Sequence, residues 1–508
     1  MSRHRNSTKV TTAAVVGVEA EPITVEADIA PGLPRTFVVG LPDAAVHEAQ
    51  ERMRSALRNT PGVDFPLQRI TVNLAPADLR KEGSGFDLAI AVSVLAARGD
   101  VVPPSAGVCL LGELSLEGGL RPTSGVLPIV SCLRDRGIDT FIVPEQNAAE
   151  AGLVQDVTVF PARTLHEVLR HIRGQRLLDP YVPRQSTVIQ PVARIDVADI
   201  AGQPQAKRCL EIAAAGGHNL LFSGPPGSGK TLLARALPGI LPSLVESEAL
   251  EVTRIYSVAG LVNPDQPLAV ERPFRSPHHT ASAVAVVGGG SSPRPGEITL
   301  AHRGVLFLDE FPEFPRAVLE ALRQPLEDGF VSVSRAQASV RFPARFTLVA
   351  SQNPCPCGFY GDPAHRCGCT PVQLERYRRR VSGPLLDRID LHCAVPRLPP
   401  EEMEGKTSAE PSKVVRERVI LARARQAERF SGMGLIVNAE MSLAELKQFC
   451  RLDDETLQLL RSAAGALQLS GRAYHRVMRV ARTIADLGGA ESIGSEHVAE
   501  ALQYRQRG

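Results

Sequence analysis

The feature that most constrains this chain is a glycine-rich loop between an apolar segment and a helical segment. Residues 220–222 are apolar, as in a buried strand, and residues 232–237 are typical of a helix. Between them lies the sequence Gly224-Pro225-Pro226-Gly227-Ser228-Gly229-Lys230-Thr231. A G-x-x-x-x-G-K-[ST] match in this strand–loop–helix context predicts a phosphate-binding loop, and an ordinary glycine-rich turn is the disfavoured alternative.

The residue types of this loop suit phosphate chemistry. The glycines let backbone amides point inward, and the helix N-terminus adds a partial positive charge. Lys230 is expected to reach the β- and γ-phosphates, and the Thr231 hydroxyl is expected to bind Mg²⁺. The sequence therefore predicts binding of a nucleoside triphosphate with Mg²⁺, and ATP is the expected nucleotide.

A second motif places two carboxylates directly after an apolar run. Residues 305–308 are apolar and are followed by Asp309 and Glu310. Such a run is typical of a strand buried on both faces of a parallel sheet, where ligands bind at the carboxyl end. Asp309 is predicted to hold Mg²⁺ and Glu310 to polarise the attacking water. The alternative, a core strand that ends in two solvated acids, is disfavoured beside a phosphate loop.

Length and composition limit the remaining possibilities. The 508 residues suffice for about three domains, and a net charge of +2 does not by itself predict nucleic-acid binding. Aromatic residues make up 4% of the chain, which disfavours a base-stacking surface. No apolar run approaches a membrane span, and nine cysteines without a secretion signal favour a reduced, cytoplasmic location.

Residues 1–175 are predicted to form a separate α+β domain. Apolar residues alternate with polar ones from 23 to 29, which predicts a strand. Further strands are expected at 37–39, 70–74, 108–111 and 141–143, and helices at 44–57, 86–97 and 126–136. Beyond this domain, a linker is predicted at 176–197, a nucleotide-binding domain at 198–395, a second linker at 396–412 and a helical lid at 413–508.

The segment 110–122, followed by Gly125 and Ile142-Val143-Pro144, resembles the proteolytic domain of Lon. Lon-type proteases pair a serine with a lysine. In this chain Gly85 stands where the nucleophile should be, and Leu127 takes the lysine position. A Lon-like fold, of the ribosomal S5 domain 2 type, without peptidase chemistry is therefore expected. A shifted dyad of Ser84 and Lys81 stays open as an alternative.

Other segments resemble motifs of the AAA+ ATPases. Residues 199–203 resemble an Asp-Ile-x-Gly-Gln segment that lies against the adenine in that superfamily, which implies this role for Ile200 and Gly202. Asn353, after an apolar run at 346–350, stands where the superfamily carries the first sensor, which orients the attacking water. The implied fold class is α/β, with an AAA+ parallel-sheet core and a C-terminal helical lid behind the Lon-like domain.

Residues 383–391 resemble a Leu-Leu-Asp-Arg-Phe-Asp stretch of the magnesium-chelatase and MCM branch of AAA+ proteins. This resemblance implies that Arg388 is an arginine finger acting in the neighbouring subunit's site. Ser470-Gly471-Arg472 matches the second sensor of the branch, which implies that Arg472 contacts the γ-phosphate, with Arg476 as the alternative.

Two insertions also point to this branch. Residues 330–334 and 338–342 predict a β-hairpin with Arg335 at its tip, and the resemblance places such hairpins at the pore of a ring. In the other insertion, His278 and His279 are adjacent. They are more easily interpreted as loop-positioning or DNA-contacting residues than as metal ligands.

Four cysteines are clustered after the expected first sensor. Cys355 and Cys357 form one Cys-x-Cys pair, and Cys367 and Cys369 form another. Together they could supply four thiolates to a tetrahedral Zn²⁺. The spacing differs from the usual Cys-x₂-Cys knuckle, so reduced cysteines in a tight loop are the alternative.

The motif order, the stretch Asn353-Pro354-Cys355-Pro356-Cys357-Gly358 and residues 385–392 are similar to the YifB/ComM family over nearly the whole chain. The resemblance implies a hexameric, ATP-driven motor that binds DNA without sequence preference and promotes branch migration when transforming DNA is integrated. A magnesium-chelatase-like motor subunit and a protein-remodelling ATPase are the alternatives.

Overall fold

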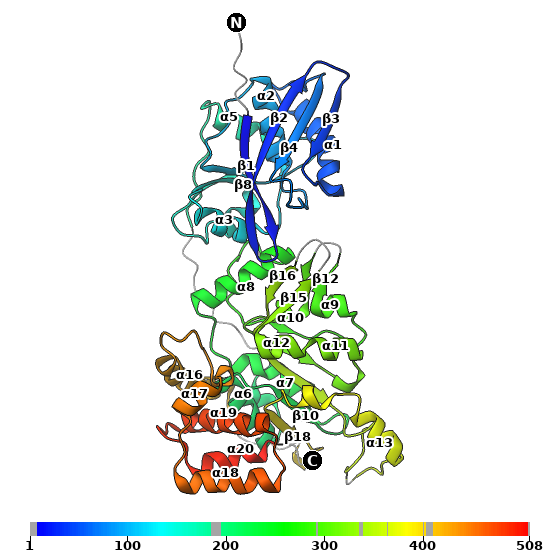
Figure 1. Ribbon diagram of the computed structural model, residues 1–508, viewed down its shortest axis with the longest axis vertical. Helices are drawn as coiled ribbons and strands as arrows, with labels where there is room; N and C mark the ends of the chain where they lie inside the picture. The colour runs from blue at the N-terminus through cyan, green and yellow to red at the C-terminus, as the bar shows by residue number, and fades with distance from the viewer. Residues whose placement is uncertain are drawn as a thin grey trace.

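The computed structural model describes residues 8–183, 195–290, 293–334, 339–362, 364–399, 401–402 and 410–505. Figure 1 shows an elongated molecule with the N-terminal domain at one end and the C-terminal helices at the other. The sheet that carries the phosphate loop lies between them. The expected fold class, an α/β core with a helical C-terminal part behind an α+β domain, is confirmed.

The N-terminal domain is built on a seven-stranded mixed sheet. Its strands, in sheet order, are β3 (Arg35–Val39), β4 (Arg69–Ala75), β2 (Glu19–Ala30), β1 (Thr8–Val16), β5 (Val108–Leu110), β8 (Thr140–Pro144) and β9 (Thr158–Ala162). The predicted strands are confirmed, whereas β1 and β9 were not predicted. β1 pairs antiparallel with β2 along its whole length, from Thr8 opposite Ala27 to Val16 opposite Glu19.

The helices of this domain follow from burial and capping. They are α1 (Ala44–Asn59), α2 (Asp87–Arg98), α3 (Val126–Arg134), α4 (Ala148–Ala151) and α5 (Leu165–Ile172). α1 begins where the Asp43 carboxylate accepts a hydrogen bond from the Val46 amide at 2.8 Å, a standard N-cap. α2 is apolar over most of its surface and is almost wholly buried against β1 and β2. A short hairpin, β6 (Glu113–Leu114) and β7 (Leu120–Arg121), lies nearby.

The nucleotide core is a parallel five-stranded sheet. Its order is β11 (Phe274–Arg275), β14 (Val305–Leu308), β17 (Thr347–Gln352), β10 (Leu220–Ser223) and β18 (Leu391–Ala394). Ser223 pairs with Gln352, and Leu308 pairs with Ala350, so the carboxyl ends of β10, β14 and β17 meet at one edge. The residues that follow these three strands are therefore brought together.

Helices and two insertions surround this sheet. The helices are α6 (Pro204–Gly216), α7 (Lys230–Ile240), α8 (Glu246–Ala259), α9 (Ala283–Val287), α10 (Glu297–Leu300), α11 (Arg316–Ala321), α12 (Arg323–Asp328), α13 (Pro371–Arg378) and α14 (Gly383–Leu386). The short strands β12 (Gly288–Gly289) and β13 (Arg294–Pro295) lie in the first insertion. The predicted hairpin is confirmed as β15 (Phe330–Ser334) and β16 (Ser339–Pro343), while Arg335 lies outside the described residues.

The C-terminal helices share one hydrophobic core with the sheet. They are α16 (Ser412–Arg429), α17 (Leu443–Phe449), α18 (Asp454–Ala466), α19 (Gly471–Gly488) and α20 (Ser495–Gln503). Val419 of α16 and Val480 of α19 belong to the same cluster as Leu220 of β10. The buried Gln426 side chain also donates to the Ala215 carbonyl of α6 at 3.0 Å. The lid is therefore packed firmly on the core.

Within the described ranges, contacts between the N-terminal domain and the core include two that join buried or partly buried residues. At the first, the Gly125 amide donates to the Ser257 carbonyl of α8 at 2.9 Å, and the Ser257 hydroxyl donates to the buried Glu150 carboxylate. At the second, the β1–β2 turn packs against β16, where a Cβ added at Gly17 would lie 2.5 Å from Cγ1 of Val340. Both contacts join elements that are far apart in sequence.

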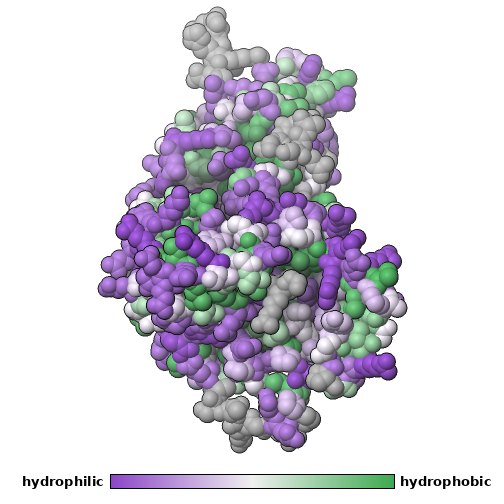
Figure 2. All heavy atoms as spheres, turned by 60° about the horizontal axis from the view of Figure 1, so that its bottom comes forward, coloured by the Kyte–Doolittle hydropathy of each residue, from purple (hydrophilic) through white to green (hydrophobic). Residues whose placement is uncertain are grey.

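The surface is predominantly polar where it is visible. Figure 2 shows hydrophilic side chains over most of one face, with hydrophobic ones in smaller groups between them. None of the helices in the described part of the chain is long and apolar enough to cross a membrane.

Candidate active site

The phosphate loop connects β10 to α7 at the carboxyl edge of the sheet. A Cβ at Gly224 would lie 2.0 Å from the Val395 carbonyl oxygen, so only glycine fits there. Gly227 and Gly229 have φ values of 77° and 92°, which side-chain-bearing residues rarely adopt. Gly229 is followed at once by α7, whose free amides face the loop. Local backbone geometry thus explains the glycines of the motif.

Lys230 lies within the curl of the loop. Its ammonium donates to the carbonyls of Gly224 and Pro225 at 2.7 and 2.8 Å, and to Oδ1 of Asn353 at 3.3 Å. Burial lowers the pKa of Lys230, and the nearby Asp309 carboxylate works in the opposite direction. The structure therefore brings together the loop lysine and Asn353, which the sequence predicted separately for phosphate binding and water positioning.

The residues expected to bind Mg²⁺ are also adjacent. The Thr231 hydroxyl donates to Oδ2 of Asp309 at 2.8 Å, and Oδ1 of Asp309 accepts hydrogen bonds from Ser351 and from the Glu310 amide. A hydroxyl and a carboxylate beside a phosphate loop form the hard oxygen donor set that Mg²⁺ prefers. The donor set fits that ion, which would neutralise phosphate charge when bound with ATP.

Glu310 has a partner that sequence reasoning did not assign. It follows Asp309 with a φ of 53°, and its Oε2 lies 3.1 Å from Nδ1 of His279. The His279 ring also packs edge-on to Phe314, with ring centroids 6.4 Å apart. The sequence shows that His278 and His279 are adjacent, but only the fold shows that His279 contacts the Glu310 carboxylate.

The segment expected to lie against the adenine is close to the loop. Ile200 is buried, and Gly202 has a φ of 52° and approaches Leu398 so closely that an added Cβ would lie 2.9 Å from it. The next residue, Gln203, donates from Nε2 to the Pro396 carbonyl at 2.7 Å. A hydrogen bond and a close packing contact therefore hold this segment against the residues that follow β18. Its contact with adenine stays a prediction.

Arg388 and Arg472 lie at the opposite edge of the sheet. A cavity of about 570 Å³ is lined by Asn219, Thr347 and Asp390, which stand at the amino ends of three parallel strands. Both arginines pair with the Glu327 carboxylate in this region. Arg388 is buried where it contacts this carboxylate, whereas Arg472 is exposed and its guanidinium lies 3.7 Å from the same carboxylate. Within one chain, the fold therefore does not bring these arginines to the phosphate loop.

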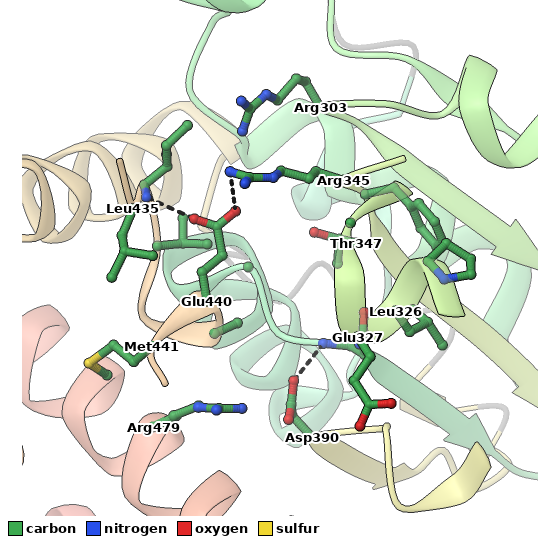
Figure 3. A pocket seen from close by; sticks show the side chains of 18 of the residues that line it. Arg303, Leu326, Glu327, Arg345, Thr347, Asp390, Leu435, Glu440, Met441 and Arg479 are labelled. Atoms are coloured by element: carbon green, nitrogen blue, oxygen red, sulfur yellow. Dashed lines mark hydrogen bonds and ion pairs between the residues drawn. The ribbon is translucent and has the colours of Figure 1, made fainter. Parts of the chain in front are cut away.

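Buried charges organise the same cavity (Figure 3). Asp390 is bonded by Arg476 at 2.5 Å and accepts from the Asn219 amide at 3.1 Å. Burial alone would raise the pKa of Asp390, but Arg476 and His218 together hold it well below its ordinary value. Arg476, the alternative to Arg472, is thus already committed to an ion pair inside its own chain.

Comparison with known proteins matches the whole chain to one group. The family model "Magnesium chelatase, subunit ChlI" matches residues 196–403, "Subunit ChlI of Mg-chelatase" matches residues 25–147, and the ChlI C-terminal model matches residues 409–505. The uncharacterized protein YifB of Salmonella typhimurium is 46% identical over 98% of this chain and 96% of its own length. Competence protein ComM of Haemophilus influenzae is 46% identical, over 97% and 96%.

The chain belongs to the YifB/ComM family. The magnesium-chelatase 38 kDa subunit of Rhodobacter capsulatus is more distant, at 26% identity over 61% of this chain and 87% of that subunit. The predicted membership of the YifB/ComM family is confirmed.

Ser84 and Lys81 of the N-terminal domain of this YifB/ComM protein each have a hydrogen-bond partner other than the other. The Ser84 hydroxyl donates to the Glu113 carboxylate, whereas the buried Lys81 ammonium donates to the Pro76 carbonyl. Leu127 is buried in α3. The alternative of a shifted Ser84–Lys81 dyad is therefore not supported, because each side chain is held by another partner.

The four clustered cysteines come together in space. Their sulfur atoms all lie within 4.8 Å of one another, in the loop between β17 and α13. Cys355 is buried, and the other three are partly buried. This is the geometry that the two Cys-x-Cys pairs predicted for a metal site.

Proposed function

We propose that this chain is an ATP-hydrolysing AAA+ motor that assembles into a hexameric ring in the cytoplasm and drives branch migration of DNA. The proposed cofactors are ATP and Mg²⁺, with a zinc ion at the four cysteines. The observation that carries the ATPase assignment is the joint placement of Lys230, Thr231, Asp309 and Glu310 at one edge of the sheet.

The positions of two arginines support the proposed ring. Arg388 and Arg472 are at the amino edge of the sheet, away from the phosphate loop of their own chain. An arginine supplied by a neighbouring subunit stabilises the charge that develops during phosphoryl transfer. The proposal assigns both residues to the neighbour's nucleotide, Arg472 from its exposed position and Arg388 after release from Glu327.

Mixed rings test this assignment. Lys230→Ala chains keep both arginines, and Arg388→Ala chains keep the phosphate loop, so mixing two nearly inactive proteins should restore part of the ATPase activity. As the control, Arg418→Ala takes the place of Arg388→Ala; it removes a guanidinium of α16 that pairs with Glu211 of α6 and with Glu410. Absence of rescue in rings shown by native mass spectrometry to be mixed would contradict an Arg388 that acts between subunits.

DNA is the proposed substrate because a relative of the same length is a competence protein and because the family resemblance implies it. With few aromatic residues and a net charge near zero, the chain should grip phosphates through local arginines rather than read bases. Arg335, outside the described residues at the end of β15, is the first candidate. Arg335→Ala should lower DNA-stimulated ATPase and leave basal ATPase nearly unchanged.

The deciding assay is strand exchange on a synthetic three- or four-way junction with ATP. Junction processing and DNA-stimulated ATPase support the proposal. Robust ATPase without DNA stimulation or junction processing would instead favour a protein-remodelling ATPase. The other candidate, a magnesium-chelatase-like motor subunit, is favoured by the family models matched along the chain, and it predicts ATPase stimulated by a chelatase partner rather than by DNA.

A further inference from the structure

Four thiols meet directly beside the phosphate loop. Sγ of Cys355 lies 3.3 Å from Sγ of Cys357 and 3.7 Å from that of Cys367, and the last two sulfur atoms are 3.5 Å apart. All four ligand atoms, with that of Cys369, fall within 4.8 Å of one another. These separations are too long for disulfides, whose sulfur atoms are about 2.05 Å apart.

The same separations suit a tetrahedral metal ion. A Zn–S bond of about 2.3 Å places neighbouring sulfur atoms of a tetrahedron about 3.8 Å apart, close to what is observed. Backbone amides also point at the sulfur atoms, since the Tyr360 amide lies 3.3 Å from Sγ of Cys355 and the Cys369 amide lies 3.4 Å from Sγ of Cys367. Such amides stabilise negative charge on sulfur. The donor set of four thiolates selects a soft or borderline ion such as zinc.

The cysteine loop is in contact with the phosphate loop. Gly358, one residue after Cys357, has a φ of 86°, and a Cβ added to it would lie 2.6 Å from Cδ of Pro226. Arg397 links the two loops from the other side, because its guanidinium lies 3.5 Å from the Pro226 carbonyl and 3.4 Å from Nδ1 of His365. The His365 ring stacks on Phe359, with centroids 4.9 Å apart.

The first sensor is tied to the same loop through the chain itself. Asn353, whose Oδ1 accepts from Lys230, stands two residues before the buried Cys355. The position of Cys355 therefore limits where the Asn353 amide can lie. A displacement of about 1 Å in such a positioning residue costs up to about a hundredfold in rate.

We propose that zinc bound by Cys355, Cys357, Cys367 and Cys369 braces the phosphate loop and the first sensor, so that ATP turnover requires the metal. This inference rests on the proposed ATPase function. Zinc stabilises the folded loop because a preformed thiolate site is absent from the unfolded chain. Without the ion, repulsion between thiolates and loss of order would release the contact between Gly358 and Pro226.

The first test asks whether the ion is present. Elemental analysis of full-length protein, purified anaerobically without chelators and with zinc in the medium, should find about one zinc per chain. Cobalt added after metal removal should give the visible absorption bands of tetrahedral cobalt–thiolate coordination. Protein that contains no zinc and gives no such bands would overturn the proposal.

The second test asks whether the ion acts as a brace. The double variant Cys367→Ser/Cys369→Ser removes two partly buried ligands, and Cys132→Ser, partly buried in α3, is the matched control. The double variant should lose zinc, bind a fluorescent ATP analogue more weakly and lose about ten- to a hundredfold in basal ATP turnover. The control should keep zinc, affinity and turnover.

Loss of zinc with nucleotide affinity and turnover within about twofold of the parent would overturn the brace. If the double variant does not fold, removing zinc from the parent with a mercurial reagent and restoring it after adding a thiol gives the same comparison. A parent protein with zinc but no ATPase would contradict the proposed function instead, and nucleotide affinity would still report on the brace.

Discussion

Replacing His279 should partly free the Glu310 carboxylate, the proposed catalytic group, in the absence of DNA. Nδ1 of His279 lies 3.1 Å from Oε2 of Glu310, in a pair whose side chains are 31% and 55% exposed. A hydrogen bond from the imidazole N–H to this half-exposed carboxylate contributes about 0.5–1 kcal/mol. That energy corresponds to a roughly two- to fivefold change in how often Glu310 is free to meet a water molecule.

We therefore expect His279→Ala to raise basal ATPase by about two- to fivefold and to reduce the further stimulation by DNA. His279 is part of the insertion that also carries α9 and the β12–β13 strands, so movement of this insertion would carry the histidine with it. Steady-state phosphate release with and without junction DNA measures both effects. His279→Gln, which keeps an N–H donor, should have a basal ATPase rate between those of His279→Ala and the parent.

His278→Ala is the matched control for a general disturbance of the loop. Its Nδ1 lies 2.8 Å from the Thr280 hydroxyl, although its ring packs against that of His279 in a tilted arrangement. A basal ATPase rate for folded His279→Ala at or below the parent rate would refute the idea that His279 holds Glu310 back from catalysis. The histidine would then be a residue that positions Glu310 for catalysis.

Three further predictions follow from particular contacts. Lys230→Ala should weaken ATP binding, whereas Glu310→Gln should keep ATP binding and lower hydrolysis by at least about a hundredfold. Measuring equilibrium ATP binding and ATPase activity on both variants separates these effects. Hydrolysis by Glu310→Gln at the parent rate would exclude Glu310 from the mechanism. DNA affinity should fall with salt by roughly one log unit per log unit of salt for each phosphate neutralised, and a flat salt response would exclude backbone binding. Glu150→Ala should lower the thermal unfolding midpoint, because three donors lose a buried acceptor at a cost of about 1–3 kcal/mol each. The control Glu145→Ala removes an exposed carboxylate and should leave the midpoint unchanged. Equal midpoints for Glu150→Ala and the parent would contradict the role of Glu150.

Most of the nucleotide site could be predicted because its residues stand in short, contiguous motifs. The loop from Gly224 to Thr231 and the pair Asp309 and Glu310 each carry a local signal, since both follow buried strands. Parallel pairing of β10, β14 and β17 then brings their carboxyl ends together. That step needs only the fold class, which the resemblance to AAA+ motifs implied.

Contacts between distant segments could not be predicted in the same way. The pairing of His279 with Glu310, and of Arg388 and Arg472 with Glu327, depends on how insertions and lid helices pack on the sheet. Periodicity gives the type of an element but not its tertiary neighbours. β1 was missed because its first residues are polar, although it lies between β2 and β5 and is partly buried.

The N-terminal domain contacts the core beside the β15–β16 hairpin. Its serine and lysine are held by other partners, but its β1–β2 turn packs on Val340, at the end of the β15–β16 hairpin nearest residues 335–338. Val16 and Val18 join the hydrophobic cluster that includes Val331 and Val333 of the same hairpin. These contacts, together with the hydrogen bond between Ser257 and Glu150, connect the hairpin to the seven-stranded sheet and the sheet domain to α8 of the core. We therefore expect the domain to restrain the element that the family resemblance places at the pore of a ring.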